Sequence, residues 1–212
     1  MEIYNPDDQV LKLKSWWKQY GTGLIAGVAI GVTVLAGLNY WKHYRQVRAE
    51  TASTLYSQLL AEIKQARTEP AMTLASQLMD GYTGTPYAGK AALLAARLRF
   101  DAHDLPGARQ DLDWAVKHAR EEAVQHTARL RLRRLMLEQG ETDAVLALLQ
   151  VKDTNGFESA YEELRGDALL AKGDRDGARR AYQTALDKLP PGATYRRLLA
   201  LKLDNLGPEA HS

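Results

Sequence analysis

One short motif recurs in this chain at a spacing that restricts what the chain can fold into. The letters DLPGAR at residues 104–109 return as DRDGAR at residues 174–179, 70 residues later. Midway between them, GETDAVLALL places Ala144 and Leu148 at the positions of apolar residues in the two copies, which makes the steps 36 and 34 residues. A period of this length is typical of a helix-turn-helix unit stacked in an array, so we expect an all-α solenoid.

The last unit shows the features of such an array most clearly. Its sequence, GDALLAKGDRDGARRAYQTALDKLP, resembles a tetratricopeptide repeat in the spacing of Gly166, Ala178, Tyr182 and Pro190. The small residues Gly166 and Ala178 are expected where the paired helices cross, Tyr182 fills the gap to the next unit, and Pro190 ends the second helix. The first unit, near residues 54–82, is degenerate, as expected of a terminal repeat.

Apolar periodicity and breaker residues predict the helix boundaries. Thr85, Asp104 and Asp174 are expected to cap helices, because their short polar side chains can accept hydrogen bonds from the first helical turn. We expect helices over residues 43–67, 70–80, 86–102, 105–119, 121–139, 141–151, 157–172, 175–189 and 193–206.

A charge-free segment ahead of the repeats predicts a membrane anchor. Residues 19–41 contain no charged side chain, and as a helix they would extend over about 35 Å, enough to cross a bilayer. Trp16, Trp17 and Tyr20 flank its start and Tyr40 and Trp41 its end, which is typical of aromatic belts at the two membrane interfaces. The expected parts are therefore a short tail (1–18), a single transmembrane helix (19–41), a stalk (42–67) and a tetratricopeptide-like repeat domain (68–212).

The glycines of this segment allow different interpretations. Gly21, Gly23 and Ala26 match the spacing of a dinucleotide-binding turn, but neither a hydrophobic strand before them nor an amphipathic helix after them is present. Gly23, Gly27 and Gly31 recur every four residues, so on a helix they form a ridge that a partner helix can approach closely. The alternative is that glycine is simply common in transmembrane helices.

The residues alone leave the orientation and the mature N-terminus open. Three lysines before the segment balance Lys42, Arg45 and Arg48 after it, so the positive-inside rule does not choose a side. Val34 and Ala36 could precede a signal-peptide cleavage site, although such a leader would have an unusually long apolar core.

Composition argues against catalysis and nucleic-acid binding. The chain has no cysteine, its five histidines lack metal-ligand spacing, and it has no nucleophile or nucleotide motif, so we expect no enzyme activity, metal or cofactor. The net charge is only +2, and the run ARLRLRRLML is interpreted as a helix with a solvated arginine face rather than as a nucleic-acid site. The adjacent Glu162 and Glu163 are likewise expected at a solvated helix start.

The first helices of the units are expected to line a groove that suits an extended peptide. Projecting the geometry of the last unit onto the others selects both cationic and apolar side chains: Arg97, Phe100, Asp101, Arg129, Arg133, Met136, Asp167 and Leu170.

Three further stretches carry a resemblance that covers essentially the whole chain. They are MEIY with DDQV at the N-terminus, an aromatic pair before a glycine-rich span, and ELRGDALLAKGDRDGAR in the last unit. On these residues the chain resembles the YfgM family of ancillary subunits of the bacterial SecYEG translocon. The resemblance implies a single-pass inner-membrane protein with a cytoplasmic N-terminus and a periplasmic repeat domain.

The implied partners are the lipid bilayer, the SecYEG translocon, a PpiD-like membrane-anchored chaperone, secreted client proteins and, through the tail, the Rcs stress-response regulator. The implied role is non-enzymatic: a scaffold that aids the handover of secreted chains. An alternative is a cell-envelope assembly or lipid-handling factor that uses the same array to grip a different periplasmic client.

Overall fold

The computed structural model describes residues 6–151, 153–154 and 156–207, except for the side chains of residues 6–9, 11–13, 22, 24–26, 28 and 29. Every regular element within these ranges is an α-helix. The chain divides into one compact unit up to Glu50 and a second from Thr51 onward. The helices are α1 (Pro6–Lys64), α2 (Thr68–Gly81), α3 (Pro86–Asp101), α4 (Leu105–His118), α5 (Glu122–Glu138), α6 (Thr142–Leu148), α7 (Glu158–Ala171), α8 (Arg175–Lys188) and α9 (Arg196–Asp204).

The first unit consists of the N-terminal part of α1. The large apolar side chains that are described in it are exposed, and Ile30, Leu35 and Tyr40 are 66%, 66% and 74% accessible. Among the described residues, no helix combines the length and the apolar character needed to cross a membrane. The expected tail (1–18) and span (19–41) fall partly outside those residues, at positions 1–5 and at the side chains named above.

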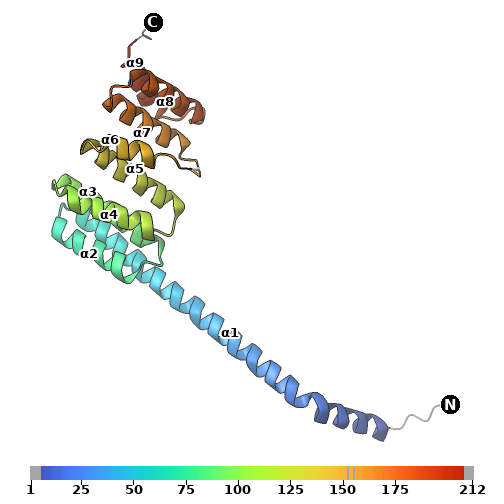
Figure 1. Cartoon of the computed structure of the whole chain (residues 1–212). Coiled ribbons are helices and arrows are strands. Elements are labelled where there is room, and N and C mark those ends of the chain that lie inside the picture. Colours follow the sequence, from blue (N-terminus) through green and yellow to red (C-terminus); the bar gives the residue numbers. More distant parts are fainter. Residues whose placement is uncertain (1–5, 152, 155, 208–212) are drawn as a thin grey trace. The chain divides into compact units, whose positions relative to one another are not determined.

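The second unit is a stack of helical hairpins in chain order, as the ribbon from cyan to red shows (Figure 1). The end of α1 pairs with α2 through a core that contains Ala52, Leu59 and Leu78, and α3 with α4, α5 with α6 and α7 with α8 form the next pairs. These pairs confirm the predicted helical repeats. The helix α6 is shorter than expected: it ends at Leu148, whereas the sequence predicts an end near residue 151.

The two copies of the repeated motif form identical helix starts. The side chain of Asp104 accepts a hydrogen bond from the backbone N–H of Gly107 at 2.9 Å, and Asp174 accepts one from Gly177 at 2.8 Å. A Cβ atom at either glycine would come too close to the capping carboxylate as it lies here, so a larger residue would require this carboxylate to shift. The third predicted cap is correct in position, because Thr85 is the N-cap residue of α3 and Pro86 follows it at the start of the helix. Its side chain makes no capping hydrogen bond, however, because the Thr85 hydroxyl donates to the carbonyl oxygen of Tyr82.

The middle unit has a different register from the one that the sequence predicts. Ala144 and Leu148 are exposed, whereas Val145 and Leu149 are 0% and 2% accessible and take the buried positions. Val145 follows the start of its unit at Glu141 by four residues, as the buried Ala108 and Ala178 follow their caps. The prediction fails because a shift of one position exchanges one apolar residue for another, while it turns the helix by about 100°.

The helices of the last unit, α7 and α8, pack around the side chain of Tyr182, which is 1% accessible. A Cβ atom at Gly166 would run into the Tyr182 ring, so the glycine is needed where α7 and α8 cross, as predicted. The same ring packs in a core with Leu199 of α9, which confirms that it also reaches the following element.

Candidate functional site

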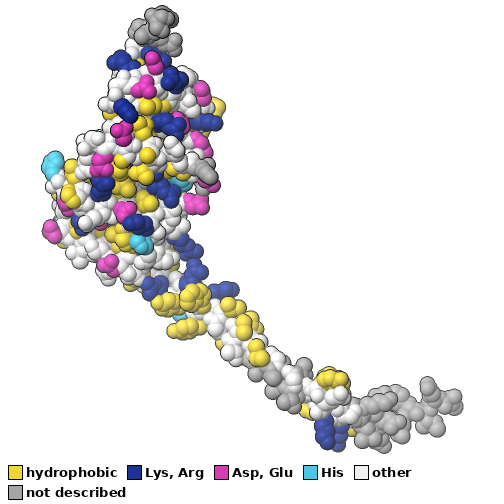
Figure 2. All heavy atoms as spheres, viewed as in Figure 1, with side chains coloured by type: hydrophobic (Ala, Val, Ile, Leu, Met, Phe, Trp, Pro, Cys, Tyr) yellow, Lys and Arg dark blue, Asp and Glu magenta, His cyan; other side chains and the backbone are white. Residues whose placement is uncertain are grey.

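Side chains from α3, α4 and α5 form a hollow of about 400 Å³, which we call the α3–α5 hollow. Its apolar lining includes Leu93, Phe100, Leu112 and Leu135. Leu112 and Leu135 are buried, whereas Phe100 is 37% accessible. The charged side chains that line it are Arg97, Arg131, Arg134 and Glu138. On the visible face of the repeat unit, hydrophobic side chains gather beside Lys and Arg side chains (Figure 2).

The three arginines of this hollow differ in their partners. Nε of Arg97 donates to a carboxylate oxygen of Asp101 at 2.8 Å, and Nη2 of Arg134 lies 3.4 Å from an oxygen of Glu163. Among the described residues, Arg131 makes no ion pair. Partial burial and then the charges of Arg97 and Arg134 lower the pKa of Arg131 from its ordinary value. All three guanidinium groups line the same hollow, so their positive charges favour an anion there.

A second hollow, of about 700 Å³, lies between α4 and α5, and we call it the α4–α5 hollow. Three of the predicted groove residues, Arg129, Arg133 and Met136, line it. Met136 is 5% accessible and belongs to the core around Val145. Arg133 is 8% accessible, with its guanidinium carbon 5.5 Å from the centroid of the Tyr161 ring. Both side chains are therefore packed against the protein itself.

The predicted groove is thus divided between different surfaces. Arg97 and Phe100 line the α3–α5 hollow, and Asp101 holds Arg97. The predicted groove residues of α5, Arg129, Arg133 and Met136, line the α4–α5 hollow. They lie on the side of the helix away from Arg131, since Arg131 and Arg133 point about 200° apart around the helix. The cause is the misplaced register of the middle unit. With the correct register, Arg134 is the α5 residue that corresponds to Arg97 and Asp167, because each of the three lies seven residues before the N-cap of the next helix.

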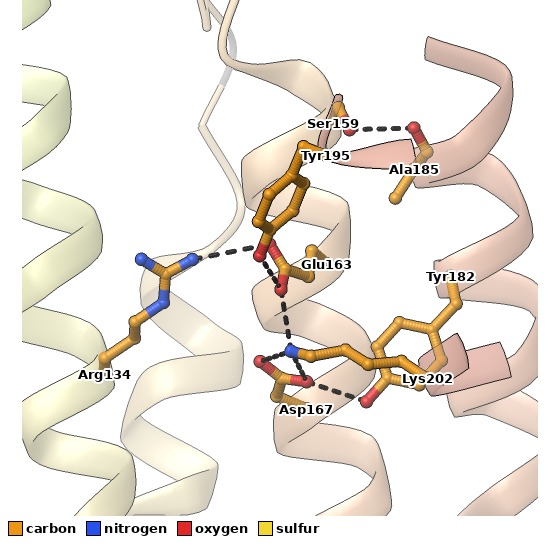
Figure 3. A network of polar contacts seen from close by, with 8 residues as sticks. All are labelled: Arg134, Ser159, Glu163, Asp167, Tyr182, Ala185, Tyr195 and Lys202. Atoms are coloured by element: carbon orange, nitrogen blue, oxygen red, sulfur yellow. Dashed lines mark hydrogen bonds and ion pairs between the residues drawn. The ribbon is translucent and has the colours of Figure 1, made fainter. Parts of the chain in front are cut away.

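The last two predicted groove residues lie on α7. Leu170 is 38% accessible, whereas Asp167 is half-buried and takes part in a polar network between α5, α7, α8 and α9 (Figure 3). The ammonium of Lys202 donates to Glu163 at 2.7 Å and to both oxygens of Asp167 at 2.7 and 2.9 Å. The Tyr182 hydroxyl donates to Asp167 at 2.7 Å, and the Tyr195 hydroxyl to Glu163 at 2.6 Å.

The network stabilises charged groups in a partly buried site. Glu163 is 2% accessible, so the expectation that it lies on a solvated helix start is wrong. Burial opposes the charge on Lys202, but the hydrogen bonds to Asp167 and Glu163 outweigh it and raise the pKa of Lys202. Burial and the hydrogen bond to Glu163 raise the pKa of Tyr195 to about 12. Both phenols and the ammonium thus stay protonated near neutral pH and act as donors.

Sequence reasoning missed Arg131, Arg134, Glu163 and Lys202 as partners in these sites. The signal for Glu163 and Asp167 was present, since side chains four residues apart share a helix face. The signal for Lys202 was not, because it comes from α9, beyond the last repeat. Within the described residues, no three His, Asp or Glu side chains gather as they would around a metal ion.

Stacked helical hairpins with a cationic, apolar hollow define a repeat protein of the tetratricopeptide class. A family model described as tetratricopeptide repeat-like domain matches residues 14–208, and the chain belongs to this family.

Proteins called ancillary SecYEG translocon subunit are similar to this chain along nearly its whole length. The one from Escherichia coli (strain K12) is 29% identical over 207 residues, which cover 97% of this chain and 99% of that protein. The one from Neisseria gonorrhoeae is 28% identical over 194 residues, or 91% and 93% of the two chains. The one from Haemophilus influenzae is 26% identical over 201 residues, or 94% and 97%. These relatives confirm the resemblance to the YfgM family.

Proposed function

We propose that this chain is a non-enzymatic adaptor of the bacterial inner membrane that associates with the SecYEG translocon. The observation that carries the proposal is the similarity, over nearly the full length of both chains, to proteins that are called ancillary subunits of that translocon. The repeat fold supports it, since stacked helical hairpins offer extended surfaces for binding protein. In this role the repeat domain passes secreted chains to a PpiD-like chaperone, and the tail connects to the Rcs regulator.

The proposed anchor is the charge-free segment of α1. Its aromatic flanks support this placement, because Trp16, Trp17 and Tyr40 are 46%, 53% and 74% accessible and could lie in the two headgroup regions. In this arrangement residues 1–18 are cytoplasmic and the second unit is periplasmic.

The glycine ridge is proposed to contact a helix of the translocon or the chaperone. A Cβ atom built at Gly23, Gly27 or Gly31 meets no described atom within 4 Å, so this side of α1 is open to a close partner. Gly37 is equally open but lies about 80° around the helix from Gly27 and about 120° from Gly31, which makes it a control for a substitution at Gly27.

The test is co-purification of SecYEG with the full-length chain in a mild detergent. We expect the wild type and Gly37→Leu to retain SecYEG and Gly27→Leu to lose most of it. Absence of SecYEG from the wild-type preparation would refute the translocon assignment. Equal retention by all three proteins would leave that assignment intact and refute the ridge.

Topology is tested separately with Ser57→Cys, since the chain has no cysteine of its own and Ser57 is exposed on α1 beyond the span. A membrane-impermeant maleimide should label this variant in cells with a permeabilised outer membrane and an intact inner membrane. Labelling that appears only after the inner membrane is opened would contradict a periplasmic repeat domain.

A further inference from the structure

We propose that the α3–α5 hollow binds an acidic peptide segment that also carries an apolar side chain, with carboxylates at Arg131 and its neighbouring arginines. This inference rests on the proposed function, in which the repeat domain binds protein, and it specifies the chemistry of what binds. The carboxylates meet the arginines at the rim, and the apolar side chain lies on the leucine and phenylalanine floor.

Charge complementarity carries the first part of the argument. The described lining has three arginines and one acid, Glu138. Asp101 and Glu163 neutralise part of the charge of Arg97 and Arg134, but Arg131 has no carboxylate partner within the described chain. A planar guanidinium offers five N–H donors in a geometry that matches a carboxylate, so Arg131 is a ready anchor for one.

The environment of Arg131 strengthens that preference. The side chain is exposed, and it lines the same hollow as two like charges, Arg97 and Arg134. A bound carboxylate would offset the repulsion from these two arginines. The hollow therefore gains more from an acidic ligand than a single solvated arginine would.

The floor decides between a peptide and a simple anion. Leu93, Phe100, Leu112 and Leu135 form an apolar surface that inorganic phosphate cannot cover. A volume of about 400 Å³ lies within the range of ligand sites, which are mostly apolar with a few placed polar groups. A peptide, unlike phosphate, can place an apolar side chain on this surface and reach the arginines with neighbouring acidic side chains.

The experiment measures fluorescence anisotropy of a labelled peptide, GSDFELDSGS, titrated with the full-length chain in detergent micelles. Two comparison peptides are GSNFQLNSGS, which lacks the charges, and GSDAEADSGS, which lacks the apolar side chains. The variants are Arg131→Gln and, as a matched control on the same helix, Arg129→Gln, which lies in the α4–α5 hollow. Equal helical circular dichroism of the variants and the wild type ensures that folding is not being measured.

We expect Arg131→Gln to weaken binding of the acidic peptide by about five-fold, as fits loss of one charge-assisted contact at a half-exposed site, while Arg129→Gln binds as the wild type does. Both comparison peptides should bind more weakly. Equal effects of the two substitutions, binding of either comparison peptide as tight as that of the acidic one, or absence of saturable binding would each overturn the proposal. SecYEG co-purification with the wild type, measured independently, reports on the proposed function alone.

Discussion

Replacing Lys202 by methionine tests whether the network at the end of the array holds the last helix in place. The substitution keeps the length of the side chain and removes the ammonium, which donates to Glu163 and Asp167 at 2.7 Å. Glu163 has a side chain that is only 3% exposed, and it would keep just the hydroxyl of Tyr195 and the distant guanidinium of Arg134. A buried carboxylate would thus lose its closest cation.

The size of the effect lies between two known limits. Removing one partner of a fully buried ion pair costs about 3–5 kcal/mol, whereas an exposed pair contributes about 0.2–1 kcal/mol. The Lys202 side chain is 31% exposed and its two partners are 3% and 23% exposed, so the site is closer to the buried limit with some access to water. We expect a loss of about 2 kcal/mol, which is about 30-fold in an equilibrium constant.

Amide hydrogen exchange of the full-length chain measures this loss where it occurs. The exchange of α9 should accelerate by about 30-fold in Lys202→Met. The double variant with Glu163→Gln should recover part of the loss, because the more deeply buried of the two carboxylates that Lys202 paired is then neutral. Lys172→Met is the control, since Lys172 pairs with Asp143 in solvent, and α9 should be unaffected. Unchanged exchange of α9 in Lys202→Met, or a double variant as damaged as the sum of the single ones, would refute this reasoning.

Two further substitutions test the core. Gly166→Ala should lower the free energy of unfolding in urea by about 2 kcal/mol, because the added methyl group collides with Tyr182, whereas Gly81→Ala, which meets open space, should be neutral or stabilising. Burial and then the charge of Arg129 lower the pKa of His126, so the folded chain holds this ring neutral while the unfolded chain protonates it below pH 6.5. Stability should therefore fall as the pH is lowered through 6.5, and the difference between wild type and His126→Phe in urea unfolding at several pH values should show it. A pH slope that His126→Phe leaves unchanged would count against this explanation.

Local chemistry explains why much of the fold could be predicted. The caps at Asp104 and Asp174 each accept a hydrogen bond from the backbone N–H three residues on, and such a rule is complete within one turn of sequence. The helix boundaries follow from similarly short signals. The crossing at Gly166 could also be predicted, because only a residue without a side chain fits beneath the Tyr182 ring.

The functional surfaces depend on relations that the local sequence does not contain. The local sequence around Glu163 predicts a solvated acid, whereas in the structure Lys202, 39 residues later, donates a hydrogen bond to it. Val145 and Ala144 are both apolar, so neither identifies the buried position of α6 by its own chemistry. The choice is made by how the two helices of the unit dock, which is a tertiary property.

That choice has its largest consequence on α5, which carries arginines on opposite sides. Arg133 lies eight residues before the start of α6, as Ala96 and Gly166 lie eight residues before the caps of their units. A long side chain thus takes the place of a small one, and its partner helix α6 has seven residues where α4 has 14. The Arg133 guanidinium uses this space to lie over the Tyr161 ring. Since Arg133 is committed to the interior, Arg131 and Arg134 are the α5 arginines left to meet a ligand between α3 and α5.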